Sequence, residues 1–177
     1  MGLSVALLRA VNVGGRKIVS MEALRGLCKE LGLAAPRSLL QSGNLIFETP
    51  LDEPALEVLL ETQAAARLGL STDFIIRSEA QWRGLIKANP LTEMADADPS
   101  HLVALLLKSP PPEERVEALR AAVAGREIIS QAGRELYIAY PDGIGESRLT
   151  NALIERRLGL RGTARNWNTI LKIASAL

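Results

Sequence analysis

The chain has 177 residues, of which 47% are hydrophobic and 23% are charged, and its formal net charge is +1. This composition is typical of a globular protein, and the length suits one medium domain or two small halves. A near-neutral chain lacks the basic footprint that non-specific nucleic-acid binding needs. The composition therefore disfavours nucleic acid as a partner without excluding it, and any anion site must be local.

Cysteine usage and apolar runs exclude several further classes of protein. The single cysteine, Cys28, rules out an internal disulfide and a zinc-binding spacing, and it falls on an apolar helical stripe. The apolar run 3–8 ends at Arg9, too early for a signal peptide or a membrane span. We therefore expect a cytoplasmic protein with no membrane partner and no metal. The only histidine, His101, stands before a predicted strand and belongs to no recognisable motif.

The first half of the chain predicts a β-α-β-β-α-β order. The segments are a strand over 3–11, a glycine-rich loop "NVGGRK", a helix over 21–31 capped by Ser20, a hairpin around Ser42-Gly43-Asn44, a helix from Asp52 to Gly69, and the strand "STDFIIR". That order is typical of a ferredoxin-like unit. A connecting helix then begins with the capping box formed by Ser78 and Gln81, and "TEMADADPS" is expected to be a polar loop.

The second half predicts the same order again. Its segments are the strand "HLVALLLK", the helix "PPPEERVEALRAAVAG", the hairpin "REIISQAGRELYIAY", the helix "SRLTNALIERRLGL", a short strand in "GTARNW" and a closing helix. The two hairpins share Gln-x-Gly at positions 41–43 and 131–133, 90 residues apart. We infer a duplication within an α+β protein: residues 1–77 form one ferredoxin-like half, 78–100 a connecting helix and loop, and 101–177 the second half with a C-terminal helix. The whole can also count as one domain.

The chain resembles the bacterial DUF1697 family, whose function is unknown. The segments that carry the resemblance are "ALLRAVNVGG", "MEALRGLCKELG", "QSGNLIF", "LYIAYPDGIGESRLTNALIERRLG" and "TARNWNTILKI", and they run almost end to end. Ala10 stands where the family has glycine, and alanine requires only that the backbone angles at this position be ordinary. The resemblance implies two ferredoxin-like halves and no activity.

Topology predicts a first cluster of site residues in the first half. In a ferredoxin-like unit the loop after the first strand and the hairpin between the second and third strands share one edge of the sheet. This edge would gather Arg9, Asn12, Arg16, Lys17, Gln41, Ser42 and Asn44 around Gly14, Gly15 and Gly43. Glycines let an anion approach backbone N–H groups. The alternative is that these glycines serve only the turns.

A second cluster is predicted at the opposite edge of the second half, where "YPDGIGESR" and "ARNWN" would meet. Its candidates are Gly143, Gly145, Arg148, Arg165, Asn166 and Lys172. The loop is neither the dinucleotide fingerprint nor a P-loop, so the expected ligand is simply a small anion, held by local positive charge. Trp167 has the helical spacing of a packing anchor, and Asn166 or Asn168 can serve as an N-cap.

Catalytic templates are absent from the sequence. It has no nucleophile elbow around Ser42, and Glu93, Asp96 and Asp98 lack the spacing of a calcium loop. Aromatic residues are 3% of the chain, and only Tyr137 in "ELYIAY" is expected to point away from the core, so an aromatic platform for RNA bases is not predicted.

Three functions stay open at this point. The first is a binding module for a small anionic ligand, which can carry phosphate. The second is a metal-independent enzyme with Ser42, Asp142 or Glu146 in acid–base roles. The third is an interaction module that binds a protein or self-associates through strand edges. Cofactor and oligomeric state are not indicated.

Overall fold

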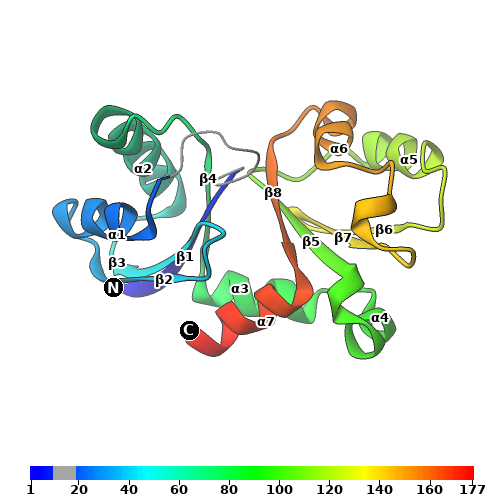
Figure 1. The fold of residues 1–177 in the computed structure, drawn as a ribbon, viewed down its shortest axis with the longest axis horizontal. Coiled ribbons are helices and arrows are strands. Elements are labelled where there is room, and N and C mark those ends of the chain that lie inside the picture. Colours follow the sequence, from blue (N-terminus) through cyan, green and yellow to red (C-terminus); the bar gives the residue numbers. More distant parts are fainter. Residues whose placement is uncertain (10–18) are drawn as a thin grey trace. The chain divides into compact units, whose positions relative to one another are not determined.

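A computed structural model describes residues 1–9 and 19–177 of the chain (Figure 1). The chain divides into two compact units, Met1–Arg83 with Leu177, and Gly84–Ala176. Several residues named in the sequence analysis lie outside the described residues: Ala10, Asn12, Gly14, Gly15, Arg16 and Lys17.

The first unit is a ferredoxin-like β-α-β-β-α-β fold. Its elements are β1 (Gly2–Leu8), α1 (Met21–Glu30), β2 (Ala34–Leu39), β3 (Asn44–Thr49), α2 (Glu53–Leu68) and β4 (Phe74–Ser78). The sheet has the order β2-β3-β1-β4, and all neighbouring strands are antiparallel. The predicted α+β class and the predicted β-α-β-β-α-β order of elements are therefore confirmed for this half.

Local sequence signals account for the ends of these helices. The hydroxyl of Ser20 accepts a hydrogen bond from the backbone N–H of Ala23 at 3.0 Å, and the Asp52 carboxylate caps α2 through Ala55 in the same way. Helix α2 ends at Gly69, whose φ of 59° is left-handed. Both predicted caps and the predicted glycine stop are confirmed.

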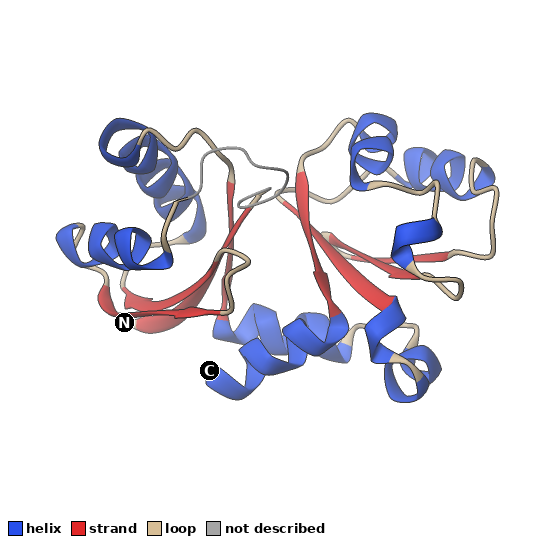
Figure 2. Ribbon diagram, in the orientation of Figure 1, coloured by secondary structure: helices blue, strands red, loops and turns tan. Residues whose placement is uncertain are grey.

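One face of the first sheet and the two helices form the core of this unit (Figures 1 and 2). Alternate strand residues such as Ala6, Leu45 and Phe47 share this core with Leu24 and Leu60 of the helices. Cys28 is also a member and is fully buried, as expected of a small hydrophobic residue. Burial raises the pKa of its thiol to about 12.

The segment after β4 is more helical than the sequence suggests. Helix α3 (Glu79–Lys87) begins at the predicted capping box, in which Ser78 and Gln81 exchange backbone–side-chain hydrogen bonds of 2.7 and 3.3 Å. The prediction of a polar loop for "TEMADADPS" is wrong, because α4 (Thr92–Ala97) and the 3-10 helix η1 (Pro99–His101) occupy it. Asn89 orders the start of α4 by accepting a hydrogen bond from Leu91, a local contact that composition did not reveal.

The second unit repeats the topology of the first. Its elements are β5 (Leu102–Leu107), α5 (Glu113–Ala121), β6 (Ile128–Ala132), β7 (Glu135–Ala139), the 3-10 helix η2 (Ile144–Glu146), α6 (Asn151–Leu158), β8 (Gly162–Asn166) and α7 (Trp167–Ala176). The sheet order β6-β7-β5-β8 matches β2-β3-β1-β4 strand for strand. This order confirms the second predicted half, although α6 begins later than its sequence segment because Thr150 caps it.

The two faces of the second sheet have different roles. Leu136, Ile138 and Tyr140 lie in the core with α5 and α6, as their alternation predicts. Tyr137 lies on the other face but is fully buried: its hydroxyl donates to the Leu85 carbonyl at 2.6 Å. Its ring also meets Trp167 edge to face, with centroids 6.2 Å apart. Tyr137 points away from the core as predicted, and α7 covers it.

Candidate functional site

The predicted edge of the first unit does bring its loops together. The backbone N–H of Leu8 donates to the carbonyl of Gly43 at 2.9 Å, so the end of β1 touches the β2–β3 turn. Arg9 is tied to the residues before β4, because its N–H donates to Asp73 and its carbonyl accepts from the Thr72 hydroxyl. Its guanidinium also lies 3.9 Å from the Asp73 carboxylate. Arg9 thus already has an acidic neighbour.

The hairpin residues of this edge largely hold the turn. Asn44 is fully buried, and its amide nitrogen donates to the Leu39 carbonyl and to the Ser42 hydroxyl, each at 2.8 Å. Gly43 has a φ of 74°, so its glycine identity serves the turn. Gln41 is exposed and lines a shallow cavity of about 550 Å³ with Val19, Ser20, Met21, Glu22, Arg25, Ser38 and Leu40. A ligand site here stays a prediction, since Asn12, Gly14 and Gly15 are not described.

A second pocket lies within the second unit, on the loop "PDGIGESR". Its volume is about 440 Å³. Two segments supply most of its wall, the end of α5 with the loop to β6 and the loop from β7 to α6. The lining residues are Ala122, Val123, Ala124, Gly125, Glu127, Tyr140, Pro141, Asp142, Gly143, Glu146, Ser147, Arg148, Leu149 and Leu153. Of the predicted site residues, Gly143 and Arg148 belong to it.

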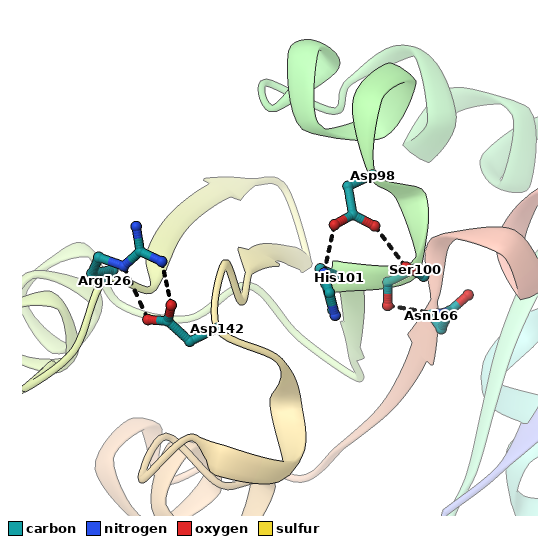
Figure 3. Close-up of polar contacts among 6 residues, drawn as sticks. All are labelled: Asp98, Ser100, His101, Arg126, Asp142 and Asn166. Atoms are coloured by element: carbon teal, nitrogen blue, oxygen red, sulfur yellow. Dashed lines mark hydrogen bonds and ion pairs between the residues drawn. The ribbon is translucent and has the colours of Figure 1, made fainter.

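An ion pair and a hydrogen bond join the two segments of this pocket. The Arg126 guanidinium donates two hydrogen bonds to the Asp142 carboxylate, one of them at 3.0 Å (Figure 3). These bonds hold the pKa of the Asp142 carboxyl below its ordinary value. Nearby, the Ser147 hydroxyl donates to Oε1 of Glu127 and accepts from the N–H of Leu149 at 3.0 Å. The loop is therefore anchored on both sides of Gly143.

The other carboxylate oxygen of Glu127 has an unusual position in this wall. Oε2 is shielded from solvent and accepts no hydrogen bond from the described residues. It packs against Gly125, where an added Cβ would collide with it. A buried acceptor without a donor costs about 1–3 kcal/mol. The absence of a side chain at Gly125 lets the carboxylate occupy this place.

Tyr140 closes the inner side of the pocket. Its side chain is 1% exposed, and its hydroxyl donates to the Leu149 carbonyl at 3.1 Å. Burial, and then the negative charge of Glu127, raise the pKa of this phenol to about 12. Tyr140 therefore stays neutral at physiological pH.

The residues of "ARNWN" occupy the same sheet edge without entering the pocket. Val103 pairs with Asn166 and Leu102 pairs with Ala139, so β7 and β8 end together as the topology predicts. Arg165, however, is 8% exposed and donates to the Thr163 hydroxyl and the Ala164 carbonyl at 2.7 and 2.8 Å. Burial lowers its pKa to about 10, which leaves it charged at neutral pH.

The remaining predicted residues have other surroundings. Asn166 caps α7 by accepting from the N–H of Asn168 at 2.8 Å, and its amide donates to the Ser100 carbonyl at 2.9 Å. Lys172 is exposed on α7, and Gly145 lies in η2 with open space around its Cα. None of these three is among the residues that line the pocket.

A polar cluster at this edge was not foreseen from the sequence. Nδ1 of His101 lies 2.5 Å from one oxygen of Asp98, and the Ser100 hydroxyl donates to the other at 2.6 Å (Figure 3). These bonds lower the pKa of the Asp98 carboxyl. His101 also lies beside the pocket loop, with Nε2 3.8 Å from the place a Cβ on Gly143 would take. The spacing Asp-x-x-His in a tight turn was the available signal, and it is too common to be specific.

Residues 1–9 and 19–177 contain no group of three or more histidine, cysteine, aspartate or glutamate side chains able to hold a metal ion. No helix in these ranges combines the length and the apolar character that crossing a membrane requires.

Comparison with known proteins identifies the family. The family defined as "Protein of unknown function (DUF1697)" matches residues 1–137. The chain belongs to this family. A solved structure, that of the conserved bacterial protein SP0830 from Streptococcus pneumoniae, is similar with a TM-score of 0.78 and 22% identity, over 98% of this chain and 97% of that one. At this identity the likeness shows the fold alone. No curated protein matches the chain.

Proposed function

We propose that this DUF1697 protein is a small-molecule-binding module whose site is the pocket on the loop "PDGIGESR". The observation that carries the proposal is the pocket itself, about 440 Å³ in volume and walled by the loop that the sequence singled out. Sites for small ligands fall in this range of volume and combine an apolar lining with a few polar groups. The lining here has that character, with Val123, Leu149 and Leu153 beside Glu127 and Arg148.

The ligand predicted from the sequence is a small anion, which can carry phosphate, and one feature supports it. Arg148 is the basic residue of the lining, and its side chain is exposed. The anionic ligand stays a prediction at this point. A cytoplasmic location likewise remains our expectation, because the single buried cysteine needs no oxidising compartment.

Binding is favoured over acid–base catalysis by the state of two of the three predicted catalytic groups, Asp142 and Ser42. Asp142 is engaged by Arg126, and its lowered pKa keeps it ionised, which disfavours it as a general acid. Ser42 belongs to the first unit, where its hydroxyl accepts from Asn44. The enzyme and interaction hypotheses stay predictions, and we build no proposal on them.

A variant that fills the pocket tests this function without altering charge. Ala124 is exposed and lines the pocket, so Ala124→Trp should obstruct it while leaving the core intact. Ala118→Trp is the matched control, because Ala118 is exposed on the neighbouring helix α5 and does not line the pocket. We expect compounds from a metabolite library that raise the Tm of the natural protein to raise that of Ala118→Trp equally.

The same compounds should leave the Tm of Ala124→Trp unchanged. Ligand shifts of equal size in both variants would place binding elsewhere and contradict the proposal. Circular dichroism of the unliganded variants provides the control for folding.

A further inference from the structure

The loop "PDGIGESR" contains a dipeptide whose backbone can react with its own side chain. Asp142-Gly143 is the single Asp-Gly sequence among the 177 residues, and no asparagine is followed by glycine. At such a pair the backbone nitrogen of the glycine can attack the side-chain carbonyl carbon of the aspartate, because glycine has no Cβ to obstruct the approach. The Asp142 side chain is 59% exposed, so water also has access to it. The sequence thus places this chemistry at one position of the chain.

The rearrangement consumes only water and regenerates it. A bond forms between the nitrogen of Gly143 and Cγ of Asp142, the amide proton and the carboxyl hydroxyl leave as water, and a succinimide ring results. Water then adds to one ring carbonyl and the C–N bond at that carbonyl breaks. Addition at Cγ restores aspartate, whereas addition at the main-chain carbon gives isoaspartate, in which the backbone runs through Cγ. The first step requires a neutral carboxyl, because an ionised carboxylate has no hydroxyl to lose.

The structure opposes this first step at both reacting groups. The Arg126 guanidinium donates two hydrogen bonds to the Asp142 carboxylate, one from Nε and one from Nη2 (Figure 3). These bonds stabilise the ionised form and lower the pKa of the carboxyl, so its neutral form is scarce. The two-point contact also fixes the orientation of the carboxylate. At the other reacting group, the N–H of Gly143 donates to the Tyr140 carbonyl at 2.9 Å.

We propose that Asp142-Gly143 is a site of spontaneous isoaspartate formation and that the ion pair with Arg126 holds this modification in check. Conversion lengthens the backbone by one atom at two residues that line the pocket. The carboxylate of the product is attached directly to Cα, so the contact with Arg126 does not persist in its present form. Arg126 therefore preserves the shape of the pocket wall, and this role requires no ligand.

The test follows the uptake of heavy oxygen from labelled water at neutral pH. Each passage through the succinimide places one labelled oxygen on residue 142, and peptide mapping by mass spectrometry locates the label and separates the aspartate and isoaspartate forms. Arg126→Gln removes the charge, so labelling should be about threefold faster or more. Arg126→Lys keeps the charge without the two-point contact and should fall between. Arg83→Gln is the matched control, because Arg83 forms an exposed ion pair with Glu79 outside this loop, and it should label at the natural rate.

A parallel incubation in urea separates the folded contact from the local sequence. Unfolding removes the ion pair, so the natural protein and Arg126→Gln should then label equally fast. Equal rates in the folded proteins, with circular dichroism showing that both are folded, would overturn the role of Arg126. Label found only at other residues would overturn the site itself. If Arg126→Gln does not fold, Arg126→Lys supplies the comparison. Neither result bears on ligand binding, because the test contains no ligand.

Discussion

Tyr140 links the pocket to the stability of the second unit. Its phenol is buried in the core and donates to Leu149, and its pKa of about 12 lies above the ordinary value of 10.0. Above pH 10 the unfolded chain releases this proton while the folded protein retains it. The stability that Tyr140 contributes is therefore complete below pH 10 and is lost as the pH rises through about 12.

The loss of stability at high pH gives a prediction for Tyr140→Phe. The natural protein should lose more of its free energy of unfolding between pH 9 and pH 11 than the variant does, because phenylalanine has no proton to lose. Urea denaturation of both proteins at the two pH values measures the difference. The loss of the hydrogen bond to Leu149 lowers the stability of the variant equally at both values and so cancels. Parallel behaviour of the two proteins would contradict the buried, neutral phenol.

Gly162 is a residue whose identity is set by close packing. A Cβ at this position would lie 2.7 Å from Cδ2 of Leu107 and 2.8 Å from the carbonyl oxygen of Leu106. Gly162→Ala should therefore lower the free energy of unfolding by about 1–3 kcal/mol, the usual cost of overpacking. Gly84→Ala is the control, because no atom lies within 4 Å of its added Cβ. In helix α3 it should be neutral or slightly stabilising. Equal effects of the two substitutions would show that the strand β8 tolerates the methyl group.

The surroundings of Arg165 and Asn166 could not be predicted from the sequence. Both were expected at a ligand because neither residue type suits a core. Arg165 is nevertheless buried, with its guanidinium bonded to its own strand, and Asn166 caps the helix that follows. Residue type and neighbours along the chain do not reveal whether another element covers that face of the strand. Arg148 and Gly143, in contrast, line the pocket because they belong to the loop "PDGIGESR", and their prediction required only that this loop be recognised.

Helix α7 is anchored by its first residue. Trp167 is 3% exposed and packs edge to face on Tyr137, at an angle of 62° between ring planes. Its helical spacing predicted this anchor; the other buried residues of the helix are Ile170 and Ile173, whereas Leu171 is 40% exposed. The sequence identified the helix and its first contact, but the exact face depended on packing against β5 and β8.

Substitution of this anchor gives a prediction at the scale of the helix. Trp167→Ala should lower the free energy of unfolding by about 3–5 kcal/mol, as expected when a large buried aromatic is removed. Leu171→Ala, on the exposed side of the same helix, should change it by less than about 0.5 kcal/mol. Urea denaturation followed by circular dichroism provides the measurement. A similar, small loss in both variants would mean that α7 is only loosely attached.

The elements that were predicted from the sequence have strong local signals, whereas helix α4, which was not predicted, has none. Strands β1 and β5 are apolar runs, and helices α1, α2 and α6 carry side-chain caps. Helix α4 has no side-chain cap and no buried residue. A short helix of this kind has neither periodicity nor a capping box, so composition alone suggested a loop.

At the scale of the whole molecule, the two units repeat one another in more than strand order. Arg77 and Arg165 occupy equivalent places in the fourth strands, paired with Val5 and Ala104 of the first strands. Each is buried, and each donates from Nη1 to the carbonyl of the residue before it, at 2.7 and 2.8 Å. This shared detail supports the duplication inferred from the two hairpins, and the sequence alone did not show it.

The pocket belongs to one unit of this repeat. The equivalent loop of the first unit, between β3 and α2, is short and leads directly from Thr49 to the cap Asp52. The corresponding segment of the second unit extends from Ala139 to Thr150 and contains η2. The longer loop supplies the wall of the site, which explains why the glycine-rich "PDGIGESR" has no counterpart in the first half.

The central claim is that this pocket binds a small ligand, and a dissociation constant tests it most directly. An amide-resolved titration with the library compound that raises the Tm most should give the same constant for the natural protein and Ala118→Trp. It should give a constant at least tenfold weaker for Ala124→Trp, with shifts confined to the pocket residues. Equal constants for all three proteins would contradict the account.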